Sequence, residues 1–156
     1  MILDGKVVAN KISKEVKDKL KNIEKDIYLA VIAIGENSAS KSYIKGIINK
    51  AEKLGVKVKL ITFQKDSKQE KIINIIKELN MDTKIKGIML QMPLPKNLNK
   101  EKIINTISVS KDIDGLTDMN LGKIVKGKND ALIPCTPLAV LKMIEHFEID
   151  IQGADV

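Results

Sequence analysis

The spacing of hydrophobic residues changes several times along the chain, and each spacing predicts a different element. Continuous apolar runs at residues 27–34 and 85–91 are typical of strands buried on both faces of a sheet. Residues 56–63 alternate apolar side chains with lysine, which predicts a third strand nearer an edge. Helices are predicted over residues 6–23, 39–54, 67–79, 100–107 and 138–147.

Turn and cap residues complete this pattern. Ser67 is a candidate cap for the third helix, and Gly55 is predicted to end the second helix as a left-handed residue. Gly122 and Gly127 punctuate a stretch that is predicted to be rich in loops.

The alternation of strands and helices predicts an α/β fold, a three-layer αβα arrangement with a mainly parallel sheet. In such sheets ligands bind where the carboxyl ends of the strands meet. The order of the elements brings four polar residues within reach of one cleft at that edge: Ser40, Tyr43, Gln91 and Asp114.

The segment Gln91-Met92-Pro93-Leu94-Pro95 follows the last predicted strand. Proline cannot donate to a strand ladder, so the strand should stop near Gln91 and continue as a stiff, extended segment. The Gln91 amide offers both a donor and an acceptor at the ligand-binding edge. Two interpretations remain open: an amide that caps the turn, and an amide that binds a ligand.

The composition excludes some classes of function. The 156 residues suffice for one domain with a core, and 44% of them are apolar. The net charge of +7 invites a nucleic-acid interpretation, which we rank last. All 27 basic residues are lysine, whereas guanine recognition most often uses arginine, and the aromatic content of 3% is too low for base-stacking surfaces. The lysines are interspersed with acidic residues and are interpreted as solvated helix faces, although lysines near a cleft attract anionic small molecules.

Other sequence features bear on location and metal chemistry. No apolar run is long enough to span a membrane, and the first residues lack a secretory signal, which predicts a cytoplasmic protein. Cys135 is the single cysteine and His146 the single histidine, which excludes an intrachain disulfide and argues against a metal centre.

Several separated motifs together resemble one family. The chain contains, in order, Ile2-Leu3-Asp4-Gly5-Lys6, Gly35-Glu36-Asn37-Ser38-Ala39-Ser40 followed by Ser42-Tyr43-Ile44, Gln91-Met92-Pro93-Leu94-Pro95, Lys111-Asp112-Ile113-Asp114-Gly115-Leu116, Asn120 with Gly122, and Pro134-Cys135-Thr136-Pro137. These segments are similar to motifs of the bifunctional methylenetetrahydrofolate dehydrogenase/methenyltetrahydrofolate cyclohydrolase (FolD-type) family. Each motif alone is weak, but the set in this order is specific and covers essentially the whole chain.

The resemblance implies a role for each matched residue. Tyr43 would stack on the folate and Gln91 would bond near the one-carbon unit, both as catalytic and substrate-binding residues. Asp114 would accept two N–H bonds from the pterin. The remaining matched candidates are Pro93 and Leu94 for substrate binding and Thr136 as a possible contact to the cofactor.

Plain structural alternatives accompany these roles. Taken alone, Tyr43 is more typical of a core-facing tyrosine on a helix. Asp112 and Asp114 suit an Asx turn before Gly115, with Asp112 as the turn residue. Cys135 is interpreted as a small buried apolar residue rather than a nucleophile, and His146 as a residue at a helix C-terminus.

One position departs from the family pattern. The family carries a lysine four residues after the tyrosine, on the same helix face, but this chain has Ile47 there. Lys45 would point away, whereas Lys50 returns to the face of Tyr43 one turn too far along and is a weak substitute. Addition of water to the methenyl carbon needs proton transfer, so Ile47 should impair the cyclohydrolase more than the dehydrogenase. The alternative function is a non-catalytic folate-binding relative.

A second departure concerns length. We expect a folate-binding catalytic domain at residues 1–147 and, at 148–156, the start of a link to an NADP-binding Rossmann domain that is absent from this chain. The chain contains no G-x-G-x-x-G loop. The resemblance implies tetrahydrofolate as substrate, NADP or NAD as cofactor through the missing domain, and a homodimer for the full-length family, with a monomer for this chain alone.

Overall fold

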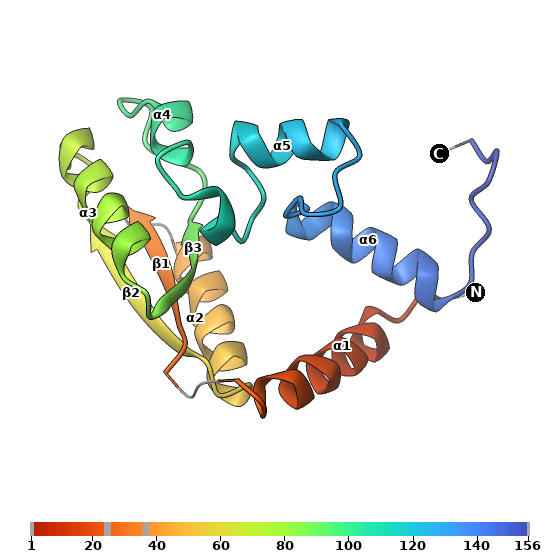
Figure 1. Cartoon of the computed structure of the whole chain (residues 1–156). Coiled ribbons are helices and arrows are strands. Elements are labelled where there is room, and N and C mark those ends of the chain that lie inside the picture. The colour runs from red at the N-terminus through yellow and green to blue at the C-terminus, as the bar shows by residue number, and fades with distance from the viewer. Residues whose placement is uncertain (1, 24–25, 36–37, 156) are drawn as a thin grey trace.

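The computed structural model describes residues 2–23, 26–35 and 38–155, so Glu36 and Asn37 of the motif after the first strand lie outside it. The elements follow the order α1 (Gly5–Leu20), β1 (Tyr28–Ile34), α2 (Ser38–Lys53), β2 (Lys57–Phe63), α3 (Gln69–Met81), β3 (Ile85–Leu90), α4 (Lys100–Ile104), the 3-10 helix η1 (Val109–Lys111), α5 (Asp118–Val125) and α6 (Cys135–His146). Every predicted strand and helix is present, with ends that differ by a few residues (Figure 1).

The sheet is parallel, with the strand order β2-β1-β3. Successive side chains of a strand point to opposite faces. In β1, Ala30, Ile32 and Ile34 therefore join one core, and Val31 and Ala33 join another. Helix α3 covers the first face and α2 the second, which confirms the predicted three-layer arrangement.

The two cores differ in size. The core on the α3 side contains Ile72, Ile76 and Leu79 from α3, together with residues of the strands and of α4. The core on the α2 side is smaller. Ile44 of α2 is buried in it, and Ile47 packs against it. Fully burying an aliphatic side chain stabilises the fold by about 1.5–3 kcal/mol, so the α3 side holds most of the apolar stabilisation.

Strand β2 lies at an edge of the sheet, as its alternating pattern predicted. Among the described strands, β2 pairs with β1 on one side and with no strand on the other side. Lys57 and Lys59 on this strand are exposed. The ammonium group of Lys57 pairs with the Asp26 carboxylate at 2.7 Å and lies 5.3 Å from the centre of the Tyr28 ring.

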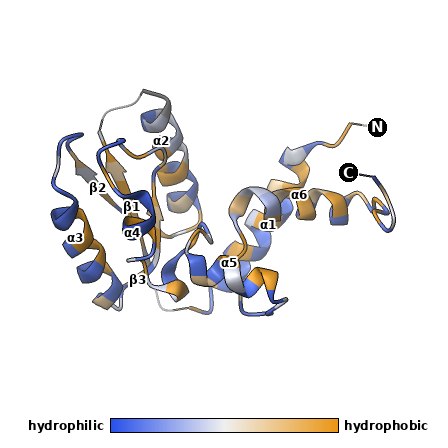
Figure 2. Cartoon of the chain, turned by 90° about the horizontal axis from the view of Figure 1, so that it is seen from above, coloured by the Kyte–Doolittle hydropathy of each residue, from blue (hydrophilic) through white to orange (hydrophobic). Residues whose placement is uncertain are grey.

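Helices α1, α5 and α6 lie beside the sheet rather than over it, so the chain has two parts (Figures 1 and 2). Helix α1 buries one residue, Val8, and α6 buries none, although both carry many apolar side chains. Within the described ranges, the model contains no helix with the length and apolarity that a membrane crossing requires.

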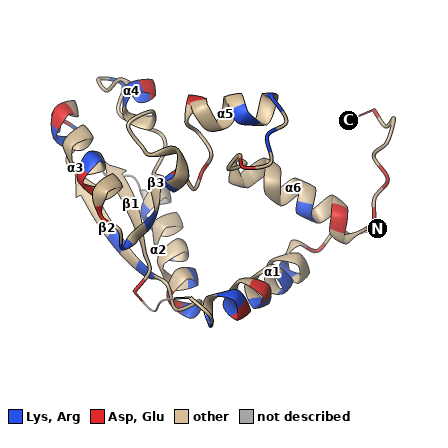
Figure 3. Ribbon diagram, in the orientation of Figure 1, with Lys and Arg blue, Asp and Glu red and all other residues tan. Residues whose placement is uncertain are grey.

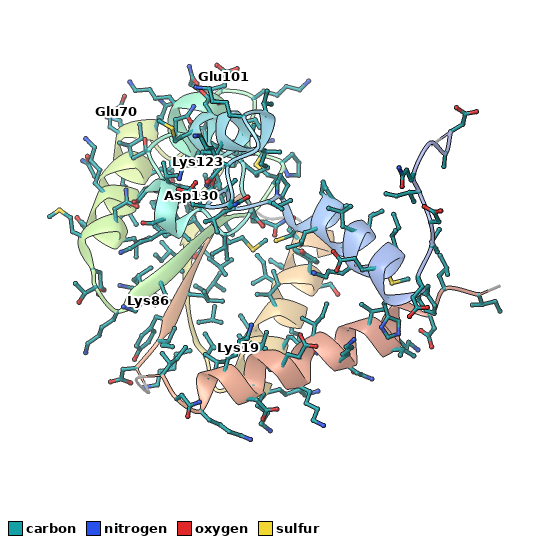
Figure 4. All side chains as sticks on the ribbon, turned by 45° about the vertical axis from the view of Figure 1, so that its right-hand side comes forward. Lys19, Glu70, Lys86, Glu101, Lys123 and Asp130 are labelled. Atoms are coloured by element: carbon teal, nitrogen blue, oxygen red, sulfur yellow. The ribbon has the colours of Figure 1, made fainter. Side chains whose placement is uncertain are left out.

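The basic residues are spread over the helices, with acidic residues among them on α1 and α3 (Figure 3). Some of them pair, as Lys123 does with Asp130 at 2.6 Å (Figure 4). This distribution agrees with the interpretation of the lysines as solvated faces.

Two local predictions are wrong. Ser67 does not cap α3, because the N-cap is Lys68 and it makes no side-chain capping bond. The predicted loop around Gly122 is helical, because Thr117 caps α5 by accepting a hydrogen bond from the backbone N–H of Asn120. A threonine followed by an aspartate is a recognisable start signal for a helix.

Candidate functional site

The end of β3 presents Gln91 as predicted. The strand ends at Leu90, and the backbone N–H of Gln91 makes one last sheet bond to the Ile32 carbonyl at 2.8 Å. The Met92–Pro93 peptide that follows is cis. Two prolines then prevent the ladder from continuing.

The hydrogen bonding of the Gln91 side chain bears on both interpretations. Its Nε2 donates to the carbonyl of Met92 at 2.7 Å, which is the bond of an amide that caps a turn. Its Oε1 is buried and accepts no hydrogen bond from the described residues. A buried acceptor without a donor costs about 1–3 kcal/mol, so this oxygen is suited to a donor that a ligand supplies.

The turn after η1 lies alongside β3 and is organised by Asp112. Asp112 forms an isolated parallel bridge with Ile88, and its side chain is 1% exposed. The Asp112 carboxylate accepts bonds from the N–H of Leu116 at 3.1 Å, from the N–H and hydroxyl of Thr117 at 2.8 Å each, and from Nδ2 of Asn120 at 2.9 Å. Asp112 is thus the turn residue, as predicted.

Asp114 has a different environment from Asp112. Burial raises the pKa of Asp114, the Cys135 thiol lowers it, and the negative charge of Asp112 raises it further, so the pKa lies above the ordinary value. For Asp112, burial raises the pKa, but hydrogen bonds from Asn120, Thr117 and Leu116 outweigh it and hold the pKa below the ordinary value. Asp112 and Asp114 therefore lie on one turn but have pKa values shifted in opposite directions.

Gly115 allows this turn to pack closely. Its φ is +62°, and a Cβ built there would lie 2.3 Å from the carbonyl oxygen of Leu132. A side chain at Gly115 would therefore push away the segment that leads to Cys135 and Thr136.

Cys135 is exposed, so the prediction of a buried cysteine is wrong. The residue lies in the first turn of α6, where its Sγ donates to the carbonyl of Ile113 at 3.3 Å. Desolvation raises the pKa of the Cys135 thiol, and Asp114 raises it further. A raised pKa disfavours the thiolate, which agrees with the prediction that Cys135 is not a nucleophile.

One face of α2 carries the second group of candidates. Tyr43 is 59% exposed, so the alternative of a core-facing tyrosine is wrong. Tyr43, Ile47 and Lys50 line one recess of about 630 Å³, together with Leu29 and Leu54. Ile47 therefore gives this recess an apolar wall at the position where the family pattern has the ammonium group of a lysine.

The opposite flank of α2 faces a different recess. Lys45 and Ile48 line a recess of about 750 Å³ beside β2, together with Leu60 and Lys65. The predicted separation of Lys45 from Tyr43 is therefore confirmed, and Lys50 shares the recess of Tyr43.

The structure places the remaining candidates as follows. Pro93 is exposed, whereas Leu94 is half-buried against the core on the α3 side. Thr136 is exposed in the first turn of α6, and His146 is the last residue of that helix, with its ring 5.0 Å from the ring of Phe147.

The site residues form two groups. Tyr43, Ile47 and Lys50 share the recess of α2, and Gln91 and Asp114 are not among its walls. Gln91 directly follows β3, and Asp114 lies two residues after Asp112, which forms the bridge to β3. Within the part of the chain that the structure describes, no cluster of His, Cys, Asp or Glu has the makings of a metal site.

The sequence analysis did not foresee two residues that support this site. The ammonium of Lys111 donates to the carbonyls of Leu79, Asn80 and Asp82 at 3.0, 2.7 and 2.8 Å, and so ties the turn to the end of α3. Asn120 is fully buried and joins three segments: its Nδ2 bonds Asp112 and the Val109 carbonyl, and its Oδ1 accepts from the Leu132 N–H at 3.2 Å. The only sequence signal for either residue was its place in a motif.

Comparisons with known proteins agree with this architecture. The family model described as tetrahydrofolate dehydrogenase/cyclohydrolase, catalytic domain, matches residues 3–114. The bifunctional protein FolD of Aquifex aeolicus is 38% identical over 160 residues, which cover 100% of this chain and 55% of that protein. The chain thus spans about half the length of the curated relatives that it matches.

Solved structures show the same fold. The bifunctional FolD enzyme of Campylobacter jejuni superposes with a TM-score of 0.90 at 37% identity, over 96% of this chain and 54% of that one. The Trypanosoma brucei enzyme, complexed with NADP cofactor and inhibitor, also gives a TM-score of 0.90, at 25% identity over 97% of this chain and 53% of that one. The chain therefore belongs to the tetrahydrofolate dehydrogenase/cyclohydrolase family, whose catalytic domain it matches.

Proposed function

We propose that this chain acts in one-carbon folate metabolism, as the folate-binding catalytic domain of a methylenetetrahydrofolate dehydrogenase/methenyltetrahydrofolate cyclohydrolase whose cyclohydrolase step is weakened. Residues 1–147 form this domain, and residues 148–156 begin a link to the part that the longer relatives have in addition. We place the reaction in the cytoplasm. We also expect the chain on its own to be a monomer.

The buried oxygen of Gln91 carries this proposal. An acceptor that is buried at the carboxyl end of a parallel strand and has no donor among the described residues suits a polar ligand at that edge. Asp114 adds a half-buried carboxyl beside the same strand, suited to the amino and ring N–H groups of a pterin. The exposed ring of Tyr43 offers a stacking surface on α2.

The Ile47 side chain separates the two activities of the family. Hydride transfer from the methylene carbon depends on orientation of substrate and cofactor, whereas addition of water to the methenyl carbon also depends on proton transfer. A positioned acid–base group typically contributes about 10²–10⁴-fold to such a step. Among the described residues that line the recess of Tyr43, Lys50 is the one that carries an amine, so we expect a slow cyclohydrolase.

The cofactor of the complete enzyme is NADP, by similarity to the relative from Trypanosoma brucei. NADP accepts a hydride when it is bound. Of the residues in this chain, Thr136 is the candidate contact, because it is exposed at the start of α6 near the turn that carries Asp114.

Folate binding is tested directly by titrating the chain with folic acid and following its absorbance. Saturable binding that is lost in Gln91→Ala and in Asp114→Ala, but kept in Asp66→Ala on the exposed loop after β2, supports the proposal. If the parent chain shows no saturable binding, the proposal is wrong.

The role of Ile47 is tested by the hydrolysis of methenyltetrahydrofolate, which needs no nicotinamide. Ile47→Lys should raise the rate by about 10²-fold or more, because it restores an ammonium group beside Tyr43. Ile48→Lys is the matched control, since Ile48 packs against the same core but lines the opposite recess.

Three outcomes are informative. A gain in Ile47→Lys alone supports the weakened cyclohydrolase. Rapid hydrolysis by the parent chain that is lost in Lys50→Ala would show instead that Lys50 replaces the family lysine. Folate binding without hydrolysis in any variant would favour the second candidate, a non-catalytic folate-binding relative.

A further inference from the structure

Gly46 lies in the middle of α2, where a glycine has a cost that needs a reason. Glycine weakens a helix interior relative to alanine, because it loses more backbone freedom on folding. Other glycines of the chain have a reason in the fold: Gly55 and Gly115 have positive φ, and a Cβ at Gly87 would overlap a neighbouring side chain. Gly46 has neither reason, because its backbone is helical and an added Cβ would have no described atom within 4 Å outside the adjoining backbone of α2.

The free space at Gly46 belongs to the recess of Tyr43. Gly46 lines this recess together with Tyr43 and Ile47, and residues three positions apart are neighbours on one helix face. The Cα–Cβ bonds of a helix tilt toward its N-terminus, so a side chain at position 46 would cover the turn that carries Tyr43. The glycine therefore keeps the space directly beside the exposed ring of Tyr43 open.

This space has the shape and polarity that a flat ring requires. A ring that stacks on a tyrosine has its centre about 4.5–7 Å from the tyrosine ring and needs room beside it. Leu29, Ala51 and Leu54 supply apolar walls to the same recess. An open, apolar surface of α2 next to an aromatic ring is therefore suited to an aromatic or heterocyclic group of a ligand.

We propose that Gly46 is a specificity-determining residue of the substrate site, which leaves room for a flat ring of the folate to lie against α2 while it stacks on Tyr43. This inference rests on the proposed function, in which Tyr43 stacks on the folate. Gly46 has no side chain with which to make a polar contact, so it acts through volume alone. Any side chain at position 46 competes with the ring for the same space.

The test measures stability and affinity in the same variants. Gly46→Ala should raise the midpoint of thermal unfolding by about 1–4 °C, because alanine favours the helix and meets no neighbour. The same change should lower the affinity for folic acid, measured by calorimetric titration, about fivefold or more, because the added methyl group overfills the site. Gly46→Leu keeps a strong helix former and should lower the affinity about 20-fold or more.

Gly122→Ala is the matched control. Gly122 also lies inside a helix with no described atom within 4 Å of an added Cβ, but it belongs to α5 and is not among the walls of the recess of Tyr43. This variant should raise the midpoint of thermal unfolding to a similar extent and leave the affinity for folic acid unchanged.

The outcomes separate this inference from the proposed function. Higher stability together with weaker binding in both Gly46 variants supports the inference, since a purely structural role would not move the two quantities in opposite directions. Equal or tighter binding of folic acid in Gly46→Ala and Gly46→Leu overturns it and leaves the proposed function standing. Lower stability of Gly46→Ala also overturns it, because the fold itself would then need the glycine. If the parent chain shows no saturable binding of folic acid, the proposed function is wrong and the inference falls with it.

Discussion

At the scale of single residues, local hydrogen bonding decides which candidate does what. The sequence presents Asp112 and Asp114 two positions apart and leaves both open to the same two interpretations. The structure separates them, because the donors of Leu116, Thr117 and Asn120 all converge on Asp112. Such convergence depends on residues up to eight positions away and cannot be inferred from spacing alone.

The raised pKa of Asp114 predicts that its ionised carboxylate destabilises the fold. A carboxyl whose pKa is higher in the folded than in the unfolded chain stabilises the fold only when it is protonated, and this contribution is lost as the pH rises through the folded pKa. Asp114→Asn should therefore raise the free energy of unfolding at neutral pH, by less than about 1 kcal/mol.

Urea denaturation at several pH values measures this effect. The advantage of Asp114→Asn should shrink as the pH falls below the folded pKa of Asp114, while folic acid binding is weakened at neutral pH. The exposed Asp66→Asn serves as control. If Asp114→Asn stabilises the fold equally at every pH, the raised pKa of Asp114 is contradicted.

Replacing glycine by alanine should change the stability of the fold in opposite directions at two positions. At Gly115 a methyl group would overlap the Leu132 carbonyl, and the positive φ adds backbone strain, so Gly115→Ala should destabilise the fold by at least about 2 kcal/mol. Gly122 lies inside α5 with no atom within 4 Å of an added Cβ, so Gly122→Ala should stabilise it by about 0.5–1 kcal/mol. Thermal unfolding of both variants checks the contrast.

At the scale of elements, hydrophobic periodicity predicted most of the fold. The strands predicted from the apolar runs of β1 and β3 were correct, because burial in a two-sided sheet leaves a direct trace in the sequence. Helix α5 was missed, because its glycine at position 122 resembles a loop signal and its short apolar pattern is weak. Its start signal lay in Thr117 and Asp118.

The contact between Lys111, the last residue of η1, and the carbonyls at the end of α3 should stabilise the packing of η1 against α3. Lys111→Met keeps the length of the side chain but removes three hydrogen bonds to carbonyls, so it should cost about 1.5–3 kcal/mol. Lys77→Met on the exposed face of α3 should change stability by less than about 0.5 kcal/mol. Equal effects in urea denaturation would show that the carbonyl contacts contribute nothing.

At the scale of the whole molecule, the chain has one part with a core and one part without. The sheet, α2, α3 and α4 supply the two cores, whereas α1 and α6 leave apolar side chains exposed. The sequence predicted both helices but could not show what their apolar side chains contact. The same limit applies to the candidate site. The motifs named its candidate residues, but only the structure shows that some line the recess of α2 and others lie at the end of β3.

Hydrogen exchange should reveal this division. Amides of β1, β3 and α3 should exchange slowest, and amides of α1 and α6 fastest, because local opening costs least where few apolar side chains are buried. Mass spectrometry of exchanged peptides measures both parts in one experiment. Protection of α6 equal to that of α3 would contradict the prediction.

The free edge of β2 has a consequence for the behaviour of the chain at high concentration. An unpaired strand edge is a template on which a second molecule can add, and such additions can continue into fibrils. Lys57 and Lys59 stand on the same side of this strand, so a second copy that paired there would bring like charges together. The alternation that first identified β2 as an edge strand thus also protects the protein from assembling with itself.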